Sequence, residues 1–147
     1  MPDAANNWNE TILADFRAHE GRITEGRLKG ATLLLLTTTG AKTGQPRTAF
    51  LGYRMDGVRY IVVGSNQGRD EHPFWLQNVR RNPIVTVELG TEKFQARATI
   101  TEGAEWRRLL DDRIAAVPQF GVYQQMTKRE LPVVALERLD EPGQTAG

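Results

Sequence analysis

The chain has 147 residues, of which 39% are hydrophobic, and this suffices for one compact domain that buries a core without covalent cross-links. It contains no cysteine, which excludes a disulfide scaffold, a thiolate metal site and a cysteine nucleophile, and which is compatible with a cytoplasmic location. Its 19 basic and 18 acidic residues leave a net charge of +1, so we expect no nucleic-acid partner.

The N-terminal segment predicts a short amphipathic helix over residues 8–20, in which Trp8, Ile12 and Phe16 recur at near-helical spacing. We expect this helix to pack on the rest of the domain. A helix that contacts a membrane surface or a partner is the less favoured alternative, because the polar face is rich in acidic residues. No segment resembles a secretion signal or reaches the roughly 18 apolar residues of a membrane span. We therefore expect no integral span, while peripheral membrane contact stays open.

Strands are predicted where apolar residues alternate with polar ones, or follow one another without interruption, and where the segment ends at turn-forming residues. Asp56-Gly57 is a two-residue hairpin signal between the second and third strands, and Gly90-Thr91-Glu92 joins the fourth and fifth. The predicted strands cover residues 31–39, 47–55, 58–64, 84–89, 93–100 and 132–138.

Two more helices are predicted, over residues 72–81, where Pro73 fits the first turn, and over residues 103–115, which carry an apolar stripe. Hairpin strands are separated by helices without a regular alternation of strand and helix. We therefore expect a mainly β (α+β) fold in which an antiparallel sheet closes into a small barrel. The polar tail, residues 140–147, predicts disorder.

A polar loop, Ala41 to Arg47, separates the first two predicted strands. Gly40 and Gly44 allow a tight backbone that turns N–H groups toward a ligand, and Lys42 and Arg47 supply cationic donors for a phosphate or a carboxylate. The spacing matches neither a Walker loop nor a dinucleotide-binding fingerprint. A plain β-turn with solvated Lys42 and Arg47 is the alternative interpretation.

Four segments carry further information through their order and spacing: LLTTTGAKTGQPR, DGVRYIVVGSNQG, HPFWLQNVRRNPIVTVELG and VPQFGVYQQMTKRELPVVALER. Together they resemble the deazaflavin-dependent nitroreductase and quinone reductase family, split β-barrel oxidoreductases that use coenzyme F420. The resemblance covers about residues 28–138. It implies an FMN-binding split β-barrel-like fold of six to seven antiparallel strands with flanking helices. The expected organisation is a helix and connector over residues 1–27, the barrel over residues 28–139 and the tail.

The resemblance also implies where the cofactor lies. The Ala41–Arg47 loop would hold the phosphate and the start of the acidic tail of F420, and the end of the third strand and the 72–81 helix would lie against its ring. Core packing is the alternative for Trp75, and His72 is expected at a helix cap or the surface rather than in a metal site. The implied cofactor-binding residues are Leu35, Thr37, Ala41, Lys42, Thr43, Gly44, Gln45, Pro46, Arg47, Val63, Gly64, Ser65, Asn66, Phe74, Trp75, Asn78 and Phe120.

The chain departs from the family pattern at a few positions. Ala41, at the acidic tail, stands where many relatives carry Arg, and Asn66, at the ring, where they often carry Lys, so the site has two cations fewer. Val117 and Phe120 stand where relatives can carry Tyr. Two alternatives stay open for the anionic tail: it is bound more weakly, or Arg27 or Lys29 supplies the missing cation. The departures at Val117 and Phe120 predict a more apolar acceptor pocket with fewer proton donors.

The reaction implied by the resemblance is the transfer of a hydride from reduced F420 to an electron-poor small molecule, such as a quinone, a nitroaromatic or a conjugated enone. A cofactor of this kind provides the reactive hydride itself, so the protein supplies orientation, exclusion of water and a proton. We predict that Tyr123 or Ser65, or a water held by them, donates this proton. A purely packing role is the alternative for Tyr123.

Two other interpretations stay open. One keeps the fold but replaces F420 by FMN, as in related split barrels of the pyridoxamine-oxidase type, and the other is a non-catalytic carrier of a flavin-like or lipophilic ligand. F420 is favoured over FMN because the loop and the segment around Trp75 are retained. The sequence decides neither between a monomer and a homodimer nor which acceptor is physiological.

Overall fold

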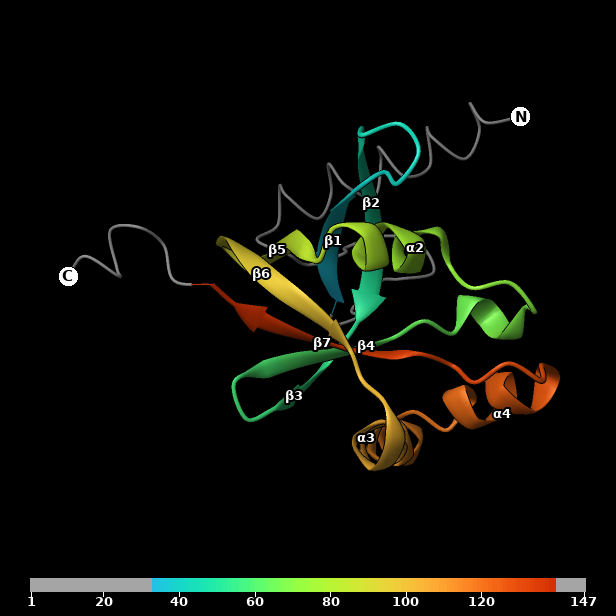
Figure 1. The fold of residues 1–147 in the computed structure, drawn as a ribbon. Coiled ribbons are helices and arrows are strands. Elements are labelled where there is room, and N and C mark those ends of the chain that lie inside the picture. The colour runs from blue at the N-terminus through green and yellow to red at the C-terminus, as the bar shows by residue number, and fades with distance from the viewer. Residues whose placement is uncertain (1–32, 140–147) are drawn as a thin grey trace, which may run out of the picture.

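The computed structural model describes residues 33–139, which form one curled antiparallel sheet with helices against it (Figure 1). Seven strands run in the order β2-β1-β5-β6-β7-β4-β3. The strands are β1 (Leu33–Thr39), β2 (Pro46–Gly52), β3 (Arg54–Asp56), β4 (Arg59–Val63), β5 (Ile84–Leu89), β6 (Glu92–Ile100) and β7 (Val133–Arg138). The helices are a short 3-10 turn η1 (Asn66–Gly68), α2 (Phe74–Arg81), α3 (Gly103–Ala116) and α4 (Gln119–Met126).

The predicted antiparallel, mainly β fold is confirmed, but the single strand predicted over residues 47–55 is wrong. The chain bends at Tyr53, and the two halves pair at opposite edges of the sheet, β2 with β1 and β3 with β4. Because β2 and β3 are joined by one residue, the sheet must curl until its edges approach each other, and β2 contacts β4. The bend at Tyr53 is thus the corner of the split barrel.

Both predicted hairpins are present, with small shifts in the turns. Asp56 pairs with Arg59, so the turn residues are Gly57 and Val58, one position later than predicted. Gly57 has φ +62°, and a positive φ at the first turn residue only is typical of a type II′ turn. In the second hairpin Leu89 pairs with Glu92, which already belongs to β6.

Two groups of buried side chains cover different parts of the sheet. Leu34 and Leu36 of β1 pack with α2, whose buried residues include Trp75, Leu76 and Val79. Ile61 and Val63 of β4 and Val133 of β7 pack with Leu109 and Leu110 of α3. Alternate strand residues and one helix stripe build each group, as the two side-chain periods require. In Figure 1, α2 lies along β1 and β2, whereas α3 and α4 lie near β4 and β7.

The helix predictions are confirmed for α2 and α3, although α2 begins at Phe74 and Pro73 is its N-cap. Helix α4 was not predicted. It contains Gly121 and buries no residue fully, and only Phe120 and Tyr123 pack, partly buried, against the core. Its C-terminal end is fixed instead by Gln124, whose Nε2 donates to the Arg129 carbonyl at 2.7 Å and whose Oε1 accepts from the Leu131 N–H at 2.9 Å.

The helix predicted over residues 8–20 and the disordered tail predicted over residues 140–147 lie outside the described residues. Within residues 33–139, none of the helices combines the length and apolar character that a membrane crossing requires.

Candidate functional site

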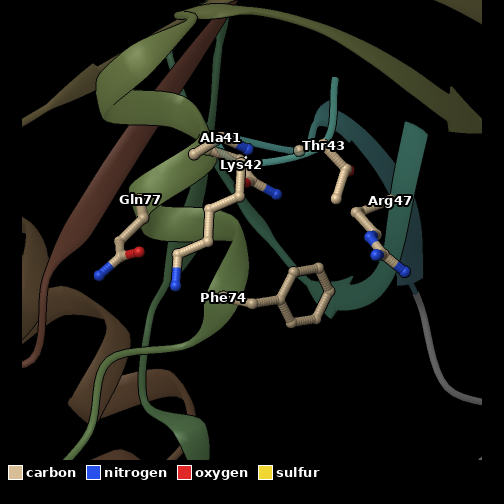
Figure 2. Close-up of a pocket in the computed structure, with 8 residues that line it drawn as sticks. Ala41, Lys42, Thr43, Arg47, Phe74 and Gln77 are labelled. Atoms are coloured by element: carbon tan, nitrogen blue, oxygen red, sulfur yellow. Dashed lines mark hydrogen bonds between the residues drawn. The ribbon is translucent and has the colours of Figure 1, made fainter. Parts of the chain in front are cut away.

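A cavity of about 420 Å³ lies between the β1–β2 loop and helix α2 (Figure 2). This volume is in the range of small-molecule sites. The structure thus brings together residues of the two segments that the sequence singled out. The lining residues are Gly40, Ala41, Lys42, Thr43, Arg47, Phe74, Gln77 and Asn78.

The loop that forms one wall of the cavity is a closed turn. The Gly40 N–H donates to the Gln45 carbonyl at 2.8 Å, and the Gly44 N–H donates to the Gly40 carbonyl at 2.9 Å. Gly44 has φ +71°, and a Cβ at Gly40 would lie 2.8 Å from Thr43 Oγ1. Both positions therefore require glycine, one for its backbone angle and the other for its small size.

Asn78 of α2 holds this loop in place. Its side chain is 6% exposed, its Oδ1 accepts a hydrogen bond from the Ala41 N–H at 2.8 Å, and its Nδ2 donates to Thr38 Oγ1 at 2.9 Å. The amide oxygen and nitrogen are both engaged inside the protein. The structure therefore gives Asn78 a positioning role at the cavity.

Several hydrogen-bond donors at the cavity remain unused. The backbone N–H groups of Lys42 and Thr43 have no hydrogen-bond partner within residues 33–139, whereas the other N–H groups of the turn are engaged. Figure 2 shows the side chains of Lys42 and Arg47 on either side of the Phe74 ring in that view. Free N–H groups and two cations form a donor set that suits a phosphate or a carboxylate.

The N-terminus of α2 reaches the same cavity. Phe74, its first residue, is 53% exposed, and the first turn has neither an acidic residue nor a side-chain cap. The partial positive charge of the helix N-terminus is therefore not offset locally and favours an anion. The exposed ring adds a flat apolar surface beside the polar loop.

A second cluster lies in the loop after β4, where Arg129 acts as a clamp. Its Nη1 donates to the Gly64 carbonyl at 3.2 Å, its Nη2 to the Ser65 carbonyl at 2.8 Å and its Nε to the Arg69 carbonyl at 2.8 Å. One side chain thus fixes the carbonyls at three positions of this loop. The backbone N–H groups of Ser65 and Asn66 have no hydrogen-bond partner within the described part of the chain.

The clamp also includes His72, whose Nδ1 lies 3.0 Å from Arg129 Nη1. A guanidinium can only donate, so Nδ1 accepts and the imidazole proton is on Nε2. Burial, followed by the charges of Arg129 and Arg80, lowers the pKa of His72 from its ordinary value of 6.5. His72 is therefore a neutral acceptor in this loop.

The turn η1 has an unusual backbone and packs on α4. Asn66 and Gln67 have φ +46° and +58°, values that only a few per cent of non-glycine residues adopt. A Cβ at Gly68 would lie 3.2 Å from Tyr123 Cα, so glycine lets the turn approach α4 closely. Ser65 precedes this turn directly. The two predicted proton donors therefore flank η1, and neither hydroxyl has a hydrogen-bond partner within residues 33–139.

Other predicted cofactor-binding residues lie elsewhere. Leu35, Val63 and Trp75 are buried, so their side chains offer no free surface to a ligand in this structure. Phe120, on α4, packs beside the α3 core group. Thr37, Gly44 and Pro46 line a separate hollow of about 340 Å³, while Gln45 is exposed and Asn66 Nδ2 donates to the Glu71 carbonyl at 2.9 Å.

Sequence reasoning missed Gln77 and Arg129. Gln77 is three residues after Phe74, and Asn78 is four residues after Phe74. Residues at this spacing share one helix face, so helical spacing alone would have placed Gln77 at the cavity. Arg129 had no such signal, because its partners are about 60 residues away. Within the described residues no three His, Asp or Glu side chains are grouped as metal ligands.

Comparison with known proteins shows the family to which the chain belongs. The model of the F420H(2)-dependent quinone reductase family matches residues 8–138. The chain is 36% identical over 132 residues to an F420H(2)-dependent quinone reductase of Mycobacterium tuberculosis, covering 85% of this chain and 86% of that protein. It is also similar to the solved structure of an F420-H2 dependent reductase (FDR-A), with TM-score 0.66 and 34% identity over 72% of this chain and 94% of that one. A solved structure described as a domain-swapped dimer is similar to this chain with TM-score 0.68 and 29% identity, and the match covers 93% of this chain and 100% of that chain. The chain belongs to the F420H(2)-dependent quinone reductase family.

Proposed function

We propose that this chain is an oxidoreductase that uses coenzyme F420 to reduce a quinone-type acceptor, the activity for which its family is named. The observation that carries the proposal is the donor set of the cavity. Lys42, Arg47 and two unused backbone N–H groups converge there with the N-terminus of α2. This chemistry fits the phosphate and the acidic tail of F420.

Different residues would hold different parts of the cofactor. Lys42, Thr43 and Arg47 would bind the anionic part, and Asn78 would keep the loop in position. Phe74 offers a ring face. The unused N–H groups of Ser65 and Asn66 suit the carbonyl oxygens and nitrogens of the deazaflavin ring, with Arg129 fixing this loop.

When bound, reduced F420 supplies the hydride. The protein orients the acceptor, keeps water away and provides a proton. The hydroxyl groups of Tyr123 and Ser65 fit the last task, because both are free of hydrogen bonds within residues 33–139 and lie on either side of η1.

The first test is a fluorescence titration with F420 and, in parallel, with FMN, at low and at moderate salt. We expect tight, salt-sensitive binding of F420 that is weakened in Lys42→Ala, because exposed charges are screened by salt. Lys93→Ala, which removes an exposed cation of β6 outside the cavity lining, is the matched control. A preference for FMN would indicate the FMN enzyme, and binding of neither would indicate the carrier.

The proton donors are tested by turnover with saturating F420 and a quinone. Tyr123→Phe and Ser65→Ala each keep the shape of the residue and remove the hydroxyl. For the true donor we expect a loss of about 100-fold in kcat. Unchanged turnover in Tyr123→Phe would remove Tyr123 from this role.

We extend the proposal to two further points. Nitroaromatics and conjugated enones are proposed as additional acceptors, because they are electron-poor like quinones. A cytoplasmic location is proposed on the absence of cysteine from the sequence.

A further inference from the structure

A second cavity lies between the end of α2, the start of α3 and the segment that leads into β7. Its volume is about 550 Å³, compared with about 420 Å³ for the cavity at the β1–β2 loop, and the two cavities share no lining residue. This volume is also in the range of small-molecule sites. The lining of the second cavity combines charged side chains of both signs with an apolar wall.

One part of this lining offers hydrogen-bond donors that the described residues leave unused. The imidazole of His72 accepts from Arg129 Nη1 through Nδ1, at 3.0 Å, and its Nε2–H has no partner within residues 33–139. The guanidinium of Arg80 makes no hydrogen bond or ion pair within the same residues. Both residues are exposed, so a ligand in the cavity can reach them.

The charges around His72 favour an anion. Burial and then the charges of Arg129 and Arg80 lower the pKa of His72, and no carboxylate of the described residues offsets this effect. The imidazole is therefore a neutral donor next to two cations. An anion at Nε2 would accept a hydrogen bond from the ring and be attracted by both guanidinium groups.

The apolar part of the lining is held in a fixed position. The indole N–H of Trp106 donates to the Leu131 carbonyl at 2.8 Å, and the guanidinium carbon of Arg107 lies 4.6 Å from the centre of the ring. Ile100 and Pro132 add aliphatic surface, and Pro132 is buried. A ligand with an apolar body would remove this surface from water, which is favourable.

Two carboxylates limit the charge that a ligand can carry. Glu102 and Glu130 line the same cavity, are exposed, and their side chains make no hydrogen bond or ion pair within residues 33–139. Neither is paired with Arg80, although all three side chains border one space. A second negative charge on a ligand would be repelled by these carboxylates, and repulsion of this kind is a common source of specificity.

We propose that this cavity is a second ligand site, which binds a small organic acid with one carboxylate and an apolar body. The carboxylate would accept hydrogen bonds from His72 Nε2 and Arg80, and the body would lie on Trp106. Glu102 and Glu130 would exclude acids with a second carboxylate. The site goes beyond the proposed function and does not depend on it, because the two cavities have no residue in common.

The first test compares probes that differ in charge. These are 3-phenylpropanoate, its neutral amide, and 3-(4-carboxyphenyl)propanoate, which carries a second carboxylate at the far end of the ring. In calorimetric titrations we expect 3-phenylpropanoate to bind about tenfold or more tightly than either of the others, since the amide loses a charged hydrogen bond and the diacid is repelled. Equal affinity of the acid and the amide would overturn the proposal.

Nuclear magnetic resonance shows where the acid binds. The chain has two histidines, His19 and His72, so the signals of the His72 ring can be assigned by comparison with His72→Gln. Addition of 3-phenylpropanoate to the wild type should shift the signals of His72 Nε2 and of the Trp106 indole. Binding that leaves the His72 signals unchanged would contradict the site.

Substitutions in the lining separate the two charge effects. Arg80→Gln should weaken binding of 3-phenylpropanoate about tenfold, to the level of the amide. Arg81→Gln, which removes the next residue of α2, an exposed cation outside the lining, is the matched control and should keep the wild-type affinity. The double variant Glu102→Gln/Glu130→Gln should bind the diacid more tightly than the wild type. Equal losses in Arg80→Gln and Arg81→Gln would indicate unspecific attraction and overturn the proposal.

A last comparison separates the two cavities. Lys42→Ala should leave the affinity for 3-phenylpropanoate unchanged, because Lys42 lines the cofactor cavity only. A loss of binding in this variant would place the acid in the cofactor cavity and refute the second site. None of these measurements needs F420, so a failure of F420 to bind would count against the proposed function alone.

Discussion

Asn78 Oδ1 accepts the hydrogen bond of the Ala41 N–H at 2.8 Å, across a separation of 37 residues. A core helix thereby fixes the loop that carries the cationic donors. The contact uses the backbone of residue 41, so it does not depend on the side chain there. The loop can therefore keep this geometry with a different side chain at residue 41.

Replacement of Asn78 by Leu should weaken both the fold and the site. Two buried hydrogen bonds are lost, and the Ala41 N–H loses its partner, so we expect the free energy of unfolding to fall by about 1–3 kcal/mol. Urea denaturation measures this change, and an F420 titration should show weaker binding. Thr38→Val is the matched control, because it removes the partner of Nδ2, together with the 3.4 Å hydrogen bond from Thr38 Oγ1 to the Arg47 carbonyl, but leaves the Ala41 contact intact. If Thr38→Val weakens F420 binding as much as Asn78→Leu, the Ala41 contact is not what positions the loop.

Replacement of Ala41 by Arg should strengthen F420 binding. Residue 41 lines the cavity and is only partly buried, so a guanidinium there can reach an anionic ligand. We expect about a tenfold decrease in the dissociation constant at low salt, and a smaller gain at high salt, because the new charge is exposed. Ala41→Gln, similar in reach but neutral, should leave the affinity near that of the wild type. A gain that is equal in Ala41→Gln would rule out charge as the cause.

Replacement of Gln67 by Gly should stabilise the protein. Gln67 has φ +58°, a backbone conformation that costs a non-glycine residue on the order of 1–3 kcal/mol, offset in part by the greater flexibility of glycine. We expect a net gain of about 1 kcal/mol in thermal or urea unfolding. Gly68→Ala should have the opposite effect, because its Cβ would lie 2.9 Å from Met126 Sδ and its φ is +79°. A destabilised Gln67→Gly would show that the glutamine side chain matters more than the backbone strain.

Stability should depend on pH through His72. Burial and the charges of Arg129 and Arg80 lower the pKa of His72, so the unfolded chain binds a proton near pH 6.5 and the folded chain only at lower pH. The free energy of unfolding should therefore be pH-independent with respect to His72 above about 6.5 and should fall as the pH decreases below it.

His72→Gln should flatten this part of the profile, because glutamine can still accept from Arg129 and does not titrate. A second decrease at more acidic pH should remain in the variant. It belongs to Asp56, whose pKa hydrogen bonds from Arg108 and Arg59 lower to about 2. A profile that is unchanged in His72→Gln between pH 5 and pH 7 would contradict the clamp.

The parts of the fold that were predictable from sequence are those with a strong local signal. The hairpin at Gly57, the strand Ile84–Leu89 and the helix Gly103–Ala116 are marked by turn residues or by apolar periodicity. The bend at Tyr53 has no such mark, because it is imposed by pairing at two distant sheet edges. Helix α4 has only eight residues and meets the core through two partly buried side chains, Phe120 and Tyr123, so its apolar pattern is too short to predict a helix.

For the candidate site, too, the sequence indicated the residues that lie in a local motif and missed those that only tertiary contacts position. Lys42, Arg47 and Phe74 lie in segments with a recognisable motif, and the structure brings them to one cavity. Trp75 was predicted with them, yet it is 3% exposed and packs in the core, because neighbouring helix residues point about 100° apart. The role of Arg129 follows only from tertiary contacts with residues far away in the sequence.

The strand order also has a consequence for how the protein is made. β7 is the last strand within residues 33–139, yet it lies between β6 and β4 and pairs with both. Until residue 138 has left the ribosome, the nascent chain can form only two separate sheets, β2-β1-β5-β6 and β4-β3. The split barrel is therefore completed only when Val133–Arg138 can pair, and a premature stop before Val133 yields two unjoined halves.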